Sequence, residues 1–491
     1  MKKHLADIIR GIDVQKVEGT TDLFVSNLVF DSRQAGVGDL FVAVKGTHVD
    51  GHRFITEVTD KGVTAVICQD FPSENSPNIT YIKVSNSALA LAKAASAFYD
   101  HPSHKLKVVG VTGTNGKTST VFFLYNLFKS LGYKAGLLST IENLIGEEHI
   151  VSTHTTADAI QISKNLSKMV EQGCDYCFME MSSHAIDQDR VSGLKIHGAV
   201  FTNITHDHLD YHLTFDKYIE AKKKLFDQLP SDAFALVNVD DRNGMIMLQN
   251  TAARKMTYSL KSPSDFKAKI IENRFEGLQL NIDNHELWCR LVGNFNAYNL
   301  MAVYAVARIE GFLPEEVLPE LSRLSPVEGR FQVIHSKAGI TAIVDYAHTP
   351  DALKNVLQTI NAVRPGNEHL ITIIGAGGDR DKLKRPILAR VACQLSDRVI
   401  LTSDNPRSEA PEAIIADMEA GLDIAVKRKA IKITDRREAI KTAVMISLKG
   451  DIILVAGKGH ETYQEINGVK HHFDDRKILN EYLNHNLTTT D

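Results

Sequence analysis

The stretch that decides the fold is V109-G-V-T-G-T-N-G-K-T-S119, which ends in the Gly-Lys-Thr of a phosphate-binding loop. The usual pattern is G-x-x-x-x-G-K-[ST]. Here Val111 stands where the first glycine is expected, and glycines occur instead at Gly110 and Gly113. The stretch still meets the physical demands of such a loop. A buried strand precedes it, Gly113 and Gly116 let the backbone approach a phosphate closely, and the helix that follows favours an anion at its N-terminus.

Two side chains after the glycines complete the predicted nucleotide site. Lys117 can reach the β- and γ-phosphates, and the Thr118 hydroxyl can bind Mg²⁺. The sequence therefore predicts that the protein binds Mg-ATP. A second glycine cluster, G375-A-G-G-D379, lacks the third glycine of the dinucleotide fingerprint and gives no reason to infer NAD.

The segments on either side of the loop predict an α/β protein of three domains. The chain has 491 residues, too many for one ordinary core. Residues 1–104 alternate short apolar runs with helical patterns and predict a small α/β domain. Residues 105–331 carry the phosphate loop in a strand-helix alternation that predicts a parallel sheet. Residues 332–491 repeat this alternation and predict a doubly wound, Rossmann-like domain.

Composition and charge weigh against several classes of protein. The formal net charge of −4 offers no basic surface for nucleic acid, and no apolar run of about 18 residues predicts membrane insertion. Five scattered cysteines suit a reducing compartment, so we expect a cytoplasmic protein. Cys174 and Cys177 form a C-x-x-C in a segment that reads as a buried strand, and we interpret them as packing residues.

Acidic residues and histidines follow the loop in two segments. In F178-M-E-M-S-S-H-A185, Glu180 ends an apolar strand, where a metal-binding carboxylate belongs in such a sheet. The segment F201-T-N-I-T-H-D-H-L-D-Y-H212 holds three histidines and two aspartates. On spacing alone it could bind zinc, but beside a Mg-ATP site we expect one histidine to assist Mg²⁺. A row of three lysines at 222–224 predicts a solvated helix face for two of them.

Eight segments, in the same order over essentially the whole chain, resemble the Mur ligases of peptidoglycan synthesis. They are G113-T-N-G-K-T118, M179-E-M-S-S-H184, H206-D-H-L-D-Y-H212, G293-N-F-N-A-Y-N299, D345-Y-A-H-T-P-D351, G377-G-D-R-D-K382, D404-N-P-R407 and G457-K-G-H-E461. That family's phosphate loop is Gly-Thr-Asn-Gly-Lys-Thr, so the displaced glycine is a family trait. The resemblance implies a UDP-binding first domain, a central ATP-binding domain and an amino-acid-binding C-terminal domain.

The resemblance implies an ATP-dependent amide ligase that adds meso-diaminopimelate to UDP-N-acetylmuramoyl-L-alanyl-D-glutamate through an acyl phosphate. Two anions meet in the first step, so the site needs cations such as Lys117 and Mg²⁺. By resemblance, Lys117, His208 and Lys222 are catalytic. Lys222 matches a lysine that the family converts to a carbamate with CO₂, and an anionic carbamate can help to hold Mg²⁺. The implied metal contacts are Thr118, Glu180, His208 and carbamylated Lys222.

The resemblance also implies which residues bind each substrate. All the substrates are small molecules, and we expect the protein to be a monomer. The ATP contacts are Gly113, Thr114, Asn115, Gly116, Lys117, Thr118, Ser119, Asn296, Asn299, Arg330 and Asp345. The contacts to the UDP-sugar peptide are Phe30, Ser32, Thr47, His48, Val49, His154, Thr155, Thr156, Ser182, Gln188 and Arg190, with His154 standing where relatives commonly have Asn. The diaminopimelate contacts are Arg380, Asp404, Asn405, Pro406, Arg407, Gly457 and Glu461.

The choice of amino acid rests on Arg407. Meso-diaminopimelate resembles lysine with an additional distal carboxylate, which an arginine fork can bind with two hydrogen bonds. Lysine would present only an ammonium, which Arg407 would repel. The alternatives are the lysine-adding form of the same ligase, a folylpolyglutamate synthase-like ligase and a nucleotide switch that catalyses no ligation.

Overall fold

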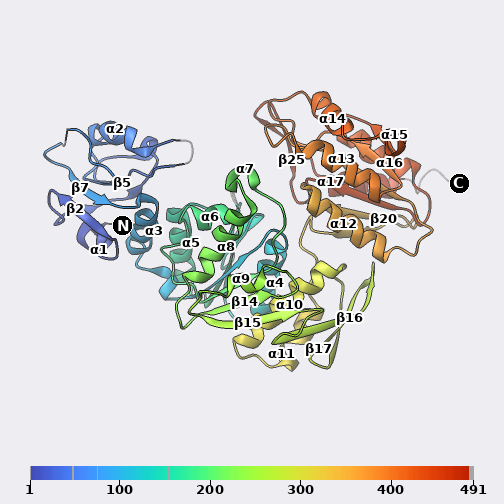
Figure 1. The fold of residues 1–491 in the computed structure, drawn as a ribbon, viewed down its shortest axis with the longest axis horizontal. Coiled ribbons are helices and arrows are strands. Elements are labelled where there is room, and N and C mark those ends of the chain that lie inside the picture. Colours follow the sequence, from blue (N-terminus) through green and yellow to red (C-terminus); the bar gives the residue numbers. More distant parts are fainter. Residues whose placement is uncertain (1, 47–48, 75, 152–154, 486–491) are drawn as a thin grey trace. The chain divides into compact units, whose positions relative to one another are not determined.

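The computed structural model describes residues 2–46, 49–74, 76–151 and 155–485, so the predicted contacts Thr47, His48 and His154 lie outside the described residues. Three main sheets with covering helices follow one another along the chain, and the predicted α/β fold class is confirmed (Figure 1). The chain divides into two compact units. The first comprises Met1–Ile204, Thr214–Phe266 and Ala302–Val317; the second comprises Thr205–Leu213, Lys267–Met301 and Leu318–Asp491. The domain limits near residues 104 and 331 remain a proposal.

The N-terminal sheet of the first unit has five strands in the order β2-β7-β6-β5-β4. Only β2 is antiparallel to its neighbour. Apolar side chains of α1 and α3 cover one face, and those of α2 cover the other. The strands are β2 (Val14–Glu18), β4 (Leu28–Val29), β5 (Leu40–Val42), β6 (Ala65–Cys68) and β7 (Thr80–Val84), beside a small pair of β1 (Lys3–His4) and β3 (Phe24–Val25); the helices are α1 (Leu5–Ile9), α2 (Ile55–Asp60) and α3 (Ser87–Phe98), with 3₁₀ turns at Ser32–Gln34, Gly51–Phe54 and Pro102–His104.

The central sheet of the first unit carries the phosphate loop. Eight of its eleven strands run in the order β11-β10-β9-β12-β8-β13-β14-β15, parallel from β9 to β15, with β10 and β11 added as an antiparallel hairpin. The strands are β8 (Lys107–Thr112), β9 (Ala135–Leu138), β10 (Glu142–Ile145), β11 (Glu148–Val151), β12 (Tyr176–Glu180), β13 (Gly198–Phe201), β14 (Phe234–Asn238) and β15 (Arg254–Ser259); the helices are α4 (Lys117–Ser130), α5 (Ala159–Glu171), α6 (Ser183–Asp187), α8 (Phe215–Asp227) and α9 (Gly244–Met247).

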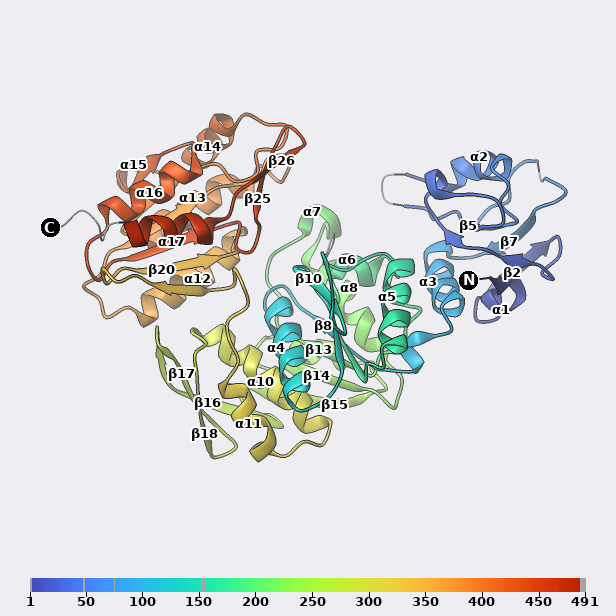
Figure 2. The ribbon, with the colours of Figure 1, turned by 180° about the vertical axis from the view of Figure 1, so that it is seen from behind.

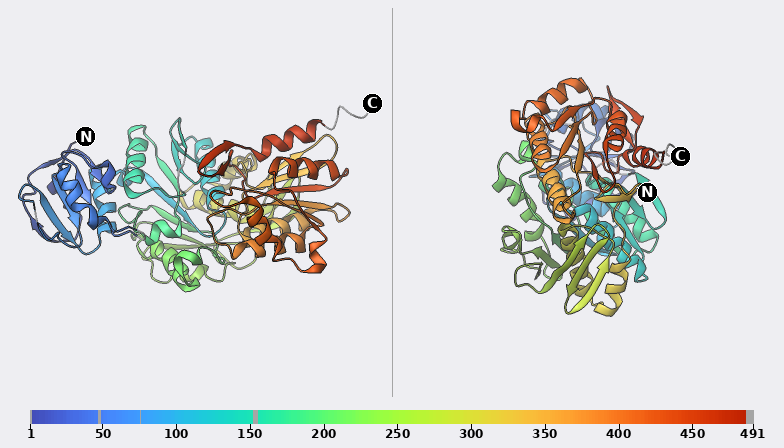
Figure 3. Two further views of the ribbon diagram at one scale, coloured as in Figure 1. Left: turned by 90° about the horizontal axis from the view of Figure 1, so that it is seen from above. Right: turned by 90° about the vertical axis from the view of Figure 1, so that its right-hand side faces the viewer.

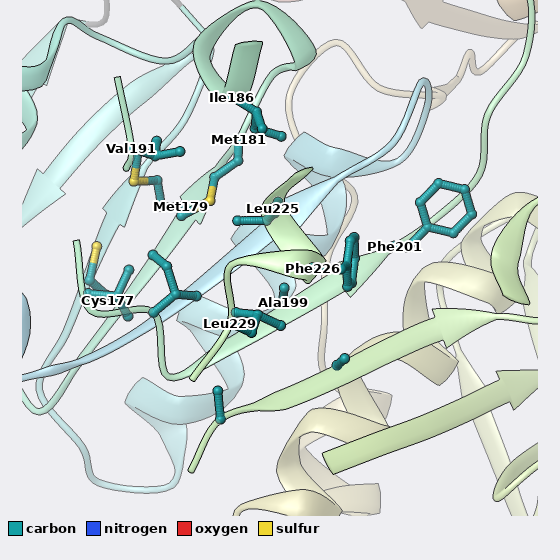
Figure 4. Packing of buried hydrophobic residues seen from close by; sticks show 14 of the residues in the cluster. Cys177, Met179, Met181, Ile186, Val191, Ala199, Phe201, Leu225, Phe226 and Leu229 are labelled. Atoms are coloured by element: carbon teal, nitrogen blue, oxygen red, sulfur yellow. The ribbon is translucent and has the colours of Figure 1, made fainter. Parts of the chain in front are cut away.

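The two faces of the central sheet are packed differently. On one face, α5, α6 and α8 bury Met181, Ile186 and Leu225 in a continuous apolar cluster (Figure 4). This cluster contains Cys174 and Cys177, and both are free thiols, as their interpretation as packing residues predicted. On the other face α4 supplies aromatic contacts, since its Phe128 ring lies 4.9 Å from that of Phe178. The sheet is therefore held between two apolar layers.

The C-terminal sheet of the second unit is doubly wound, in the order β19-β20-β24-β21-β22-β23. All its strands are parallel except β19. Helices α12, α13 and α14 cover one face, and α16 and α17 cover the other (Figure 2). The strands are β19 (Gln332–His335), β20 (Thr341–Asp345), β21 (Leu370–Ile374), β22 (Arg398–Leu401), β23 (Ala430–Lys432) and β24 (Ile452–Ala456), with a hairpin of β25 (Tyr463–Ile466) and β26 (Val469–His472); the helices are α12 (Pro350–Val363), α13 (Lys384–Leu395), α14 (Pro411–Glu419), α15 (Ile424–Lys427), α16 (Arg436–Ile446) and α17 (Asp475–His485).

The remaining elements include a meander that the sequence patterns did not predict. Strands β16 (Phe266–Arg274), β17 (Gly277–Ile282) and β18 (His285–Cys289) pair antiparallel. The β17-β18 turn uses two left-handed residues, Asp283 and Asn284, as a two-residue hairpin requires. Helix α7 (Leu209–His212) is a short turn, α10 spans Asn294–Ile309 and α11 spans Pro314–Ser322. Figure 3 shows α17 as the last helix of the chain, and no helix among the described residues is long and apolar enough to cross a membrane.

Candidate active site

The phosphate loop is held in shape by glycines and by the end of the neighbouring strand β13. Gly113 has a φ of 152°, and a Cβ there would lie 1.9 Å from the Thr202 Oγ1 atom. Gly116 is left-handed, with a φ of 86°, and precedes the first turn of α4. The Thr202 hydroxyl donates to the Asn115 carbonyl at 2.7 Å, and the Asn115 N–H donates to Asn203 Oδ1 at 3.0 Å. The loop backbone is therefore fixed before any ligand binds.

The displaced glycine serves the sheet rather than the phosphate. Gly110 lies inside β8, where a Cβ would come within 2.5 Å of the Met181 sulfur. Val111 follows it in the same strand and is completely buried. The glycine needed for close packing therefore comes one residue before the position expected from the common pattern, while Gly113 and Gly116 shape the loop.

Two lysines converge on one carbonyl of the loop. The Lys117 ammonium donates to the carbonyls of Gly113 and Thr114 at 2.9 and 2.8 Å. The Lys222 ammonium, from helix α8, donates to the same Gly113 carbonyl at 2.9 Å and lies 4.7 Å from the centre of the Tyr218 ring. Lys222 is 1% exposed, unlike a lysine of a solvated helix face. Of the three lysines in this row, Lys222 is thus the one that reaches the phosphate loop.

Glu180 supplies a buried carboxylate beside the loop. It ends β12 next to Val111 of β8 and is 1% exposed. Its Oε1 atom accepts the Thr140 N–H at 2.8 Å, whereas Oε2 has no hydrogen-bond partner among the described residues. A buried carboxylate oxygen without a partner is costly, and a hard cation such as Mg²⁺ would satisfy it. Glu180 and the hydroxyl of Thr118, which is 7% exposed in the first turn of α4, thus fit the predicted metal.

The described residues contain no group of three or more His, Cys, Asp or Glu side chains placed to hold a metal ion by themselves. Magnesium commonly takes only one or two carboxylates and completes its shell with water and substrate phosphates. The site is consistent with that mode of binding and offers no closed zinc cage.

The histidine-rich segment lies in the second unit, where His208 precedes α7 in a left-handed conformation with a φ of 54°. Its Nε2 atom lies 3.6 Å from Asp207 Oδ2, and the Lys384 ammonium lies 3.4 Å from the other oxygen of that carboxylate. Burial raises the pKa of Asp207, but His208 and Lys384 outweigh it, so that this pKa is lowered. Asp207 thus favours its anionic form between His208 and Lys384. The role of His208 at magnesium stays a prediction.

Four residues predicted to bind the UDP-sugar peptide form one hydrogen-bonded group around the end of β12. The Thr156 hydroxyl donates to the Glu180 carbonyl at 2.9 Å and accepts the Ser182 N–H at 3.0 Å. Arg190 donates to the Thr156 carbonyl at 3.0 Å and to Gln188 Oε1 at 2.6 Å. The guanidinium is thereby oriented beside the strand end that carries Glu180.

The other predicted contacts of this substrate lie elsewhere in the first unit. In the N-terminal domain, Phe30 is 39% exposed, Val49 is 56% exposed and Ser32 is buried. Thr155 directly precedes Thr156 and is partly exposed.

The remaining predicted nucleotide contacts lie in the second unit. Asn296 and Asn299 are buried in α10, where the Asn299 amide donates to Asn296 Oδ1 at 3.2 Å. The Arg330 guanidinium stacks 4.4 Å from the centre of the Tyr346 ring. Asp345 accepts two backbone N–H groups at 2.7 Å, yet burial raises its pKa against the effect of Arg330. Each of these side chains is thus placed by a contact within the second unit.

Two loops of the C-terminal sheet bring the predicted diaminopimelate contacts together. Loop 377–380 follows β21 and loop 404–409 follows β22. The Arg407 guanidinium donates to the Gly378 carbonyl at 2.7 Å, and its Nε lies 3.5 Å from a carboxylate oxygen of Glu465. Arg407 is left-handed with a φ of 50°, and Arg380 is exposed. The carboxyl ends of neighbouring parallel strands are where such folds bind ligands.

Glu461 and Asn405 meet in the same region. The Asn405 amide donates to Glu461 Oε2 at 2.9 Å, and Asn405 Oδ1 accepts the Glu465 N–H at 2.9 Å. Gly457 is left-handed, and a Cβ there would come within 2.6 Å of Asp404 Oδ2. Pro406 continues the same loop. The structure therefore groups Asp404, Asn405, Arg407, Gly457 and Glu461.

Two charged residues of this region were missed by sequence reasoning. Lys458 is completely buried and donates to Asn405 Oδ1 and Glu461 Oε2. Arg385 is also buried and forms ion pairs with Glu409 at 2.7 Å and Asp417 at 2.8 Å. The only signal for Lys458 was a lysine between two glycines, and for Arg385 a charge at the start of an otherwise apolar helix.

Known proteins are similar to this chain over nearly its whole length. Three family models match: Mur ligase family, catalytic domain, over residues 25–99; Mur ligase middle domain, over 111–307; and Mur ligase, glutamate ligase domain, over 329–459. A relative from Cytophaga hutchinsonii named UDP-N-acetylmuramoyl-L-alanyl-D-glutamate--2,6-diaminopimelate ligase is 55% identical and aligns over 98% of this chain and 99% of its own. One of the same name from Bacteroides fragilis is 53% identical over 97% and 98%.

A solved structure also matches over the full length. The protein in it is named UDP-N-acetylmuramoyl-L-alanyl-D-glutamate--2,6-diaminopimelate ligase as well; it is 32% identical, and the match covers 100% of both chains with a TM-score of 0.71. The resemblance carried by the eight motifs is thereby confirmed. The chain belongs to the Mur ligase family.

Proposed function

We propose that this protein is an ATP-dependent ligase that adds meso-diaminopimelate to UDP-N-acetylmuramoyl-L-alanyl-D-glutamate in peptidoglycan precursor synthesis. The observation that carries the proposal is that one chain contains both a phosphate loop and a loop with Asp404-Asn405-Pro406-Arg407, in which Asn405 contacts Glu461. The full-length relatives named as diaminopimelate ligases support it.

In the first chemical step, a carboxylate oxygen of D-glutamate attacks the γ-phosphorus of ATP. An O–P bond forms, the bond to the β-phosphate oxygen breaks, and ADP leaves. We assign Lys117 to the γ-phosphate, because its ammonium already lies on the loop carbonyls. We assign Arg190, oriented by Gln188, to a carboxylate of the peptide. These cations lower the repulsion between the two anions.

In the second step the amine of diaminopimelate attacks the acyl carbon, and the tetrahedral intermediate expels phosphate. Magnesium, when bound, would neutralise charge on the transferring phosphoryl group. Glu180 and Thr118 would hold it, and we propose His208 as a further contact. We also propose that Lys222 carries a carbamate, formed by attack of its neutral amine on CO₂ with loss of a proton. In that form the side chain would be an anion and could no longer donate to Gly113 through an ammonium.

Arg407 supports diaminopimelate over lysine. Its guanidinium is fixed by Gly378 and neighbours the Glu465 carboxylate, so it is presented in a defined orientation. A distal carboxylate would gain a charge-assisted hydrogen bond there, whereas the ammonium of lysine would be repelled. The cytoplasmic location and the monomeric state remain predictions from the sequence.

A reconstitution assay tests the proposal. Purified protein receives Mg-ATP, UDP-N-acetylmuramoyl-L-alanyl-D-glutamate and either meso-diaminopimelate or L-lysine, and phosphate release and product mass are followed. We expect phosphate release that depends on both co-substrates, and a product heavier by one diaminopimelate residue. Release without amino acid would support a nucleotide switch, and equal use of lysine would overturn the role of Arg407.

A further inference from the structure

Lys458 occupies an unusual position within the group of residues that we assign to the amino acid. It lies between two left-handed glycines, Gly457 and Gly459, with φ values of 112° and 54°. Its side chain is 0% exposed. A fully buried lysine is costly unless its ammonium is paired, so its partners indicate what it does.

The partners of Lys458 are polar groups that we assign to diaminopimelate. The Nζ atom donates to Asn405 Oδ1 at 3.0 Å and to Glu461 Oε2 at 3.1 Å, and lies 3.6 Å from Asp404 Oδ1. The Asn405 amide holds the same Glu461 oxygen. The other oxygen, Glu461 Oε1, accepts no hydrogen bond from the residues that the structure describes. One face of the carboxylate is thus fixed internally and the other is left to accept a donor.

The charges of this group do not cancel. Asp404 and Glu461 carry two negative charges, and Lys458 supplies one positive charge, so the three together carry −1. Arg407, in the same region, forms its ion pair with Glu465, at 3.5 Å, and not with these three residues. A net charge of −1 matches one ammonium, and Arg407 matches one carboxylate. Together they complement the zwitterionic end of diaminopimelate.

We propose that Lys458 is a specificity-determining residue, which sets the charge of the amino-acid pocket so that a zwitterionic end is accepted and a lone ammonium is disfavoured. The inference rests on the proposed function. Without Lys458 the same group would carry −2 and would attract the ammonium of lysine more strongly, while the distal carboxylate of diaminopimelate would be repelled.

The test is Lys458→Met, which keeps the length of the side chain and removes its charge. Purified wild-type and variant enzymes are assayed with diaminopimelate and with L-lysine, and the two kcat/KM values are divided. This ratio does not depend on the fraction of active enzyme, so partial unfolding does not change it. We expect the preference for diaminopimelate to fall by about tenfold or more, as for the loss of a buried charge, and the KM for ATP to stay within about twofold.

The matched control is Lys470→Met. The Lys470 ammonium lies 4.2 Å from the centre of the Tyr463 ring, which Lys458 approaches to 5.6 Å, but Lys470 is exposed. The control should keep the wild-type ratio. An unchanged ratio in Lys458→Met, with both kcat/KM values reduced together, would show a purely structural role and overturn the inference.

Asp404→Asn provides a second test, in which the preference for diaminopimelate should change in the opposite direction. This variant tests the inference even if Lys458→Met does not fold. Removing one carboxylate leaves the group neutral, so the preference for diaminopimelate over lysine should rise. A fall or no change would overturn the inference. If the wild-type enzyme itself does not ligate diaminopimelate, the proposed function fails instead, and the two failures remain distinguishable.

Discussion

The phosphate loop and the two amino-acid loops, 377–380 and 404–409, are both predicted ligand sites at strand ends. The first is shaped mainly by its backbone, and the other two are held mainly by side chains. The phosphate loop is shaped by backbone: Gly113 and Gly116 adopt conformations that favour glycine, and Thr202 fixes the chain between them. The amino-acid loops place two non-glycine residues, Asp379 and Arg407, in left-handed conformations. Such residues are strained and need support from their surroundings.

That support comes from hydrogen bonds that carboxylate side chains accept between loops 377–380 and 404–409. The Asp379 carboxylate accepts the N–H and the hydroxyl of Ser408, and the Glu409 carboxylate accepts the Asp379 N–H. Arg385 binds both Glu409 oxygens from helix α13, and this pairing lowers the pKa of Glu409 to about 2. A phosphate can therefore be bound by main-chain geometry, whereas a zwitterionic amino acid needs oriented charges.

The largest expected effect is at the backbone-built site. Gly113→Ala should lower kcat by about 100-fold or more, because the new Cβ meets Thr202 Oγ1 at 1.9 Å and displaces the loop. The measurement is phosphate release at saturating substrates. Gly132→Ala is the control, since Gly132 is also left-handed but has no atom within 4 Å of its added Cβ. Near-normal kcat in Gly113→Ala would show that the loop shape does not control phosphate transfer.

Lys222→Ala should lower kcat almost as much, by roughly 100-fold, because it removes the carbamate that we propose for this buried lysine. Short carboxylates added to the assay should restore part of the activity by supplying the missing anion. Lys223→Ala is the control from the same helix, since its ammonium forms an ion pair with Asp227. Full activity of Lys222→Ala would rule out the carbamate.

Arg385→Met should act on the side-chain-built site alone. Without the guanidinium, Glu409 no longer holds the two loops, and the KM for diaminopimelate should rise about tenfold. The KM for ATP should be unchanged, which initial-rate kinetics with each substrate varied in turn would show. Arg390→Met, an exposed arginine on the same helix, should leave both KM values unaltered. An equal rise in both KM values would mean that the two sites are not built independently.

The smallest expected effect concerns the far end of β8, the strand that leads into the phosphate loop. There the Glu310 carboxylate lies 2.6 Å from the Lys107 ammonium and 2.6 Å from His197 Nε2. It also accepts a hydrogen bond from the Tyr176 hydroxyl at 2.9 Å. Burial raises the pKa of Glu310, but His197 and Lys107 outweigh it and lower the pKa to about 2. Since the pKa is lower when folded than when unfolded, the stabilisation is complete above about pH 4.5 and is lost as the pH falls toward 2.

Glu310→Gln should therefore reduce the free energy of unfolding at pH 7 by about 1–3 kcal/mol, and the deficit should shrink as the pH falls below about 4.5. Urea unfolding at several pH values measures this. A deficit that stays constant from pH 7 to pH 3 would show that the Glu310 charge does not contribute. Activity per folded molecule should change little, because the phosphate loop is fixed locally by β13.

The same contrast explains what the sequence could predict. A site built from the main chain depends on glycines at fixed positions, so Gly113, Gly116 and the strand before them could be predicted from the sequence. The α/β class followed from the alternation of apolar runs with helical patterns. Arg385 and Glu310 act through partners that are distant along the chain, Glu409 and Lys107. Lys458 also contacts Asn405, 53 residues away, and a lysine between two glycines does not by itself reveal this contact. The meander of β16–β18 was missed because its strands mix buried with exposed residues and contain no strong apolar run.

The most direct test of the proposed chemistry follows the oxygen atoms of the substrate. UDP-N-acetylmuramoyl-L-alanyl-D-glutamate labelled with ¹⁸O in the D-glutamate carboxylates is incubated with the protein, Mg-ATP and meso-diaminopimelate, and the mass of the released phosphate is measured. If the carboxylate is phosphorylated and then attacked by the amine, each phosphate carries one ¹⁸O atom. Unlabelled phosphate would mean that water cleaves ATP, and would contradict the assignment of this protein as a ligase acting through an acyl phosphate.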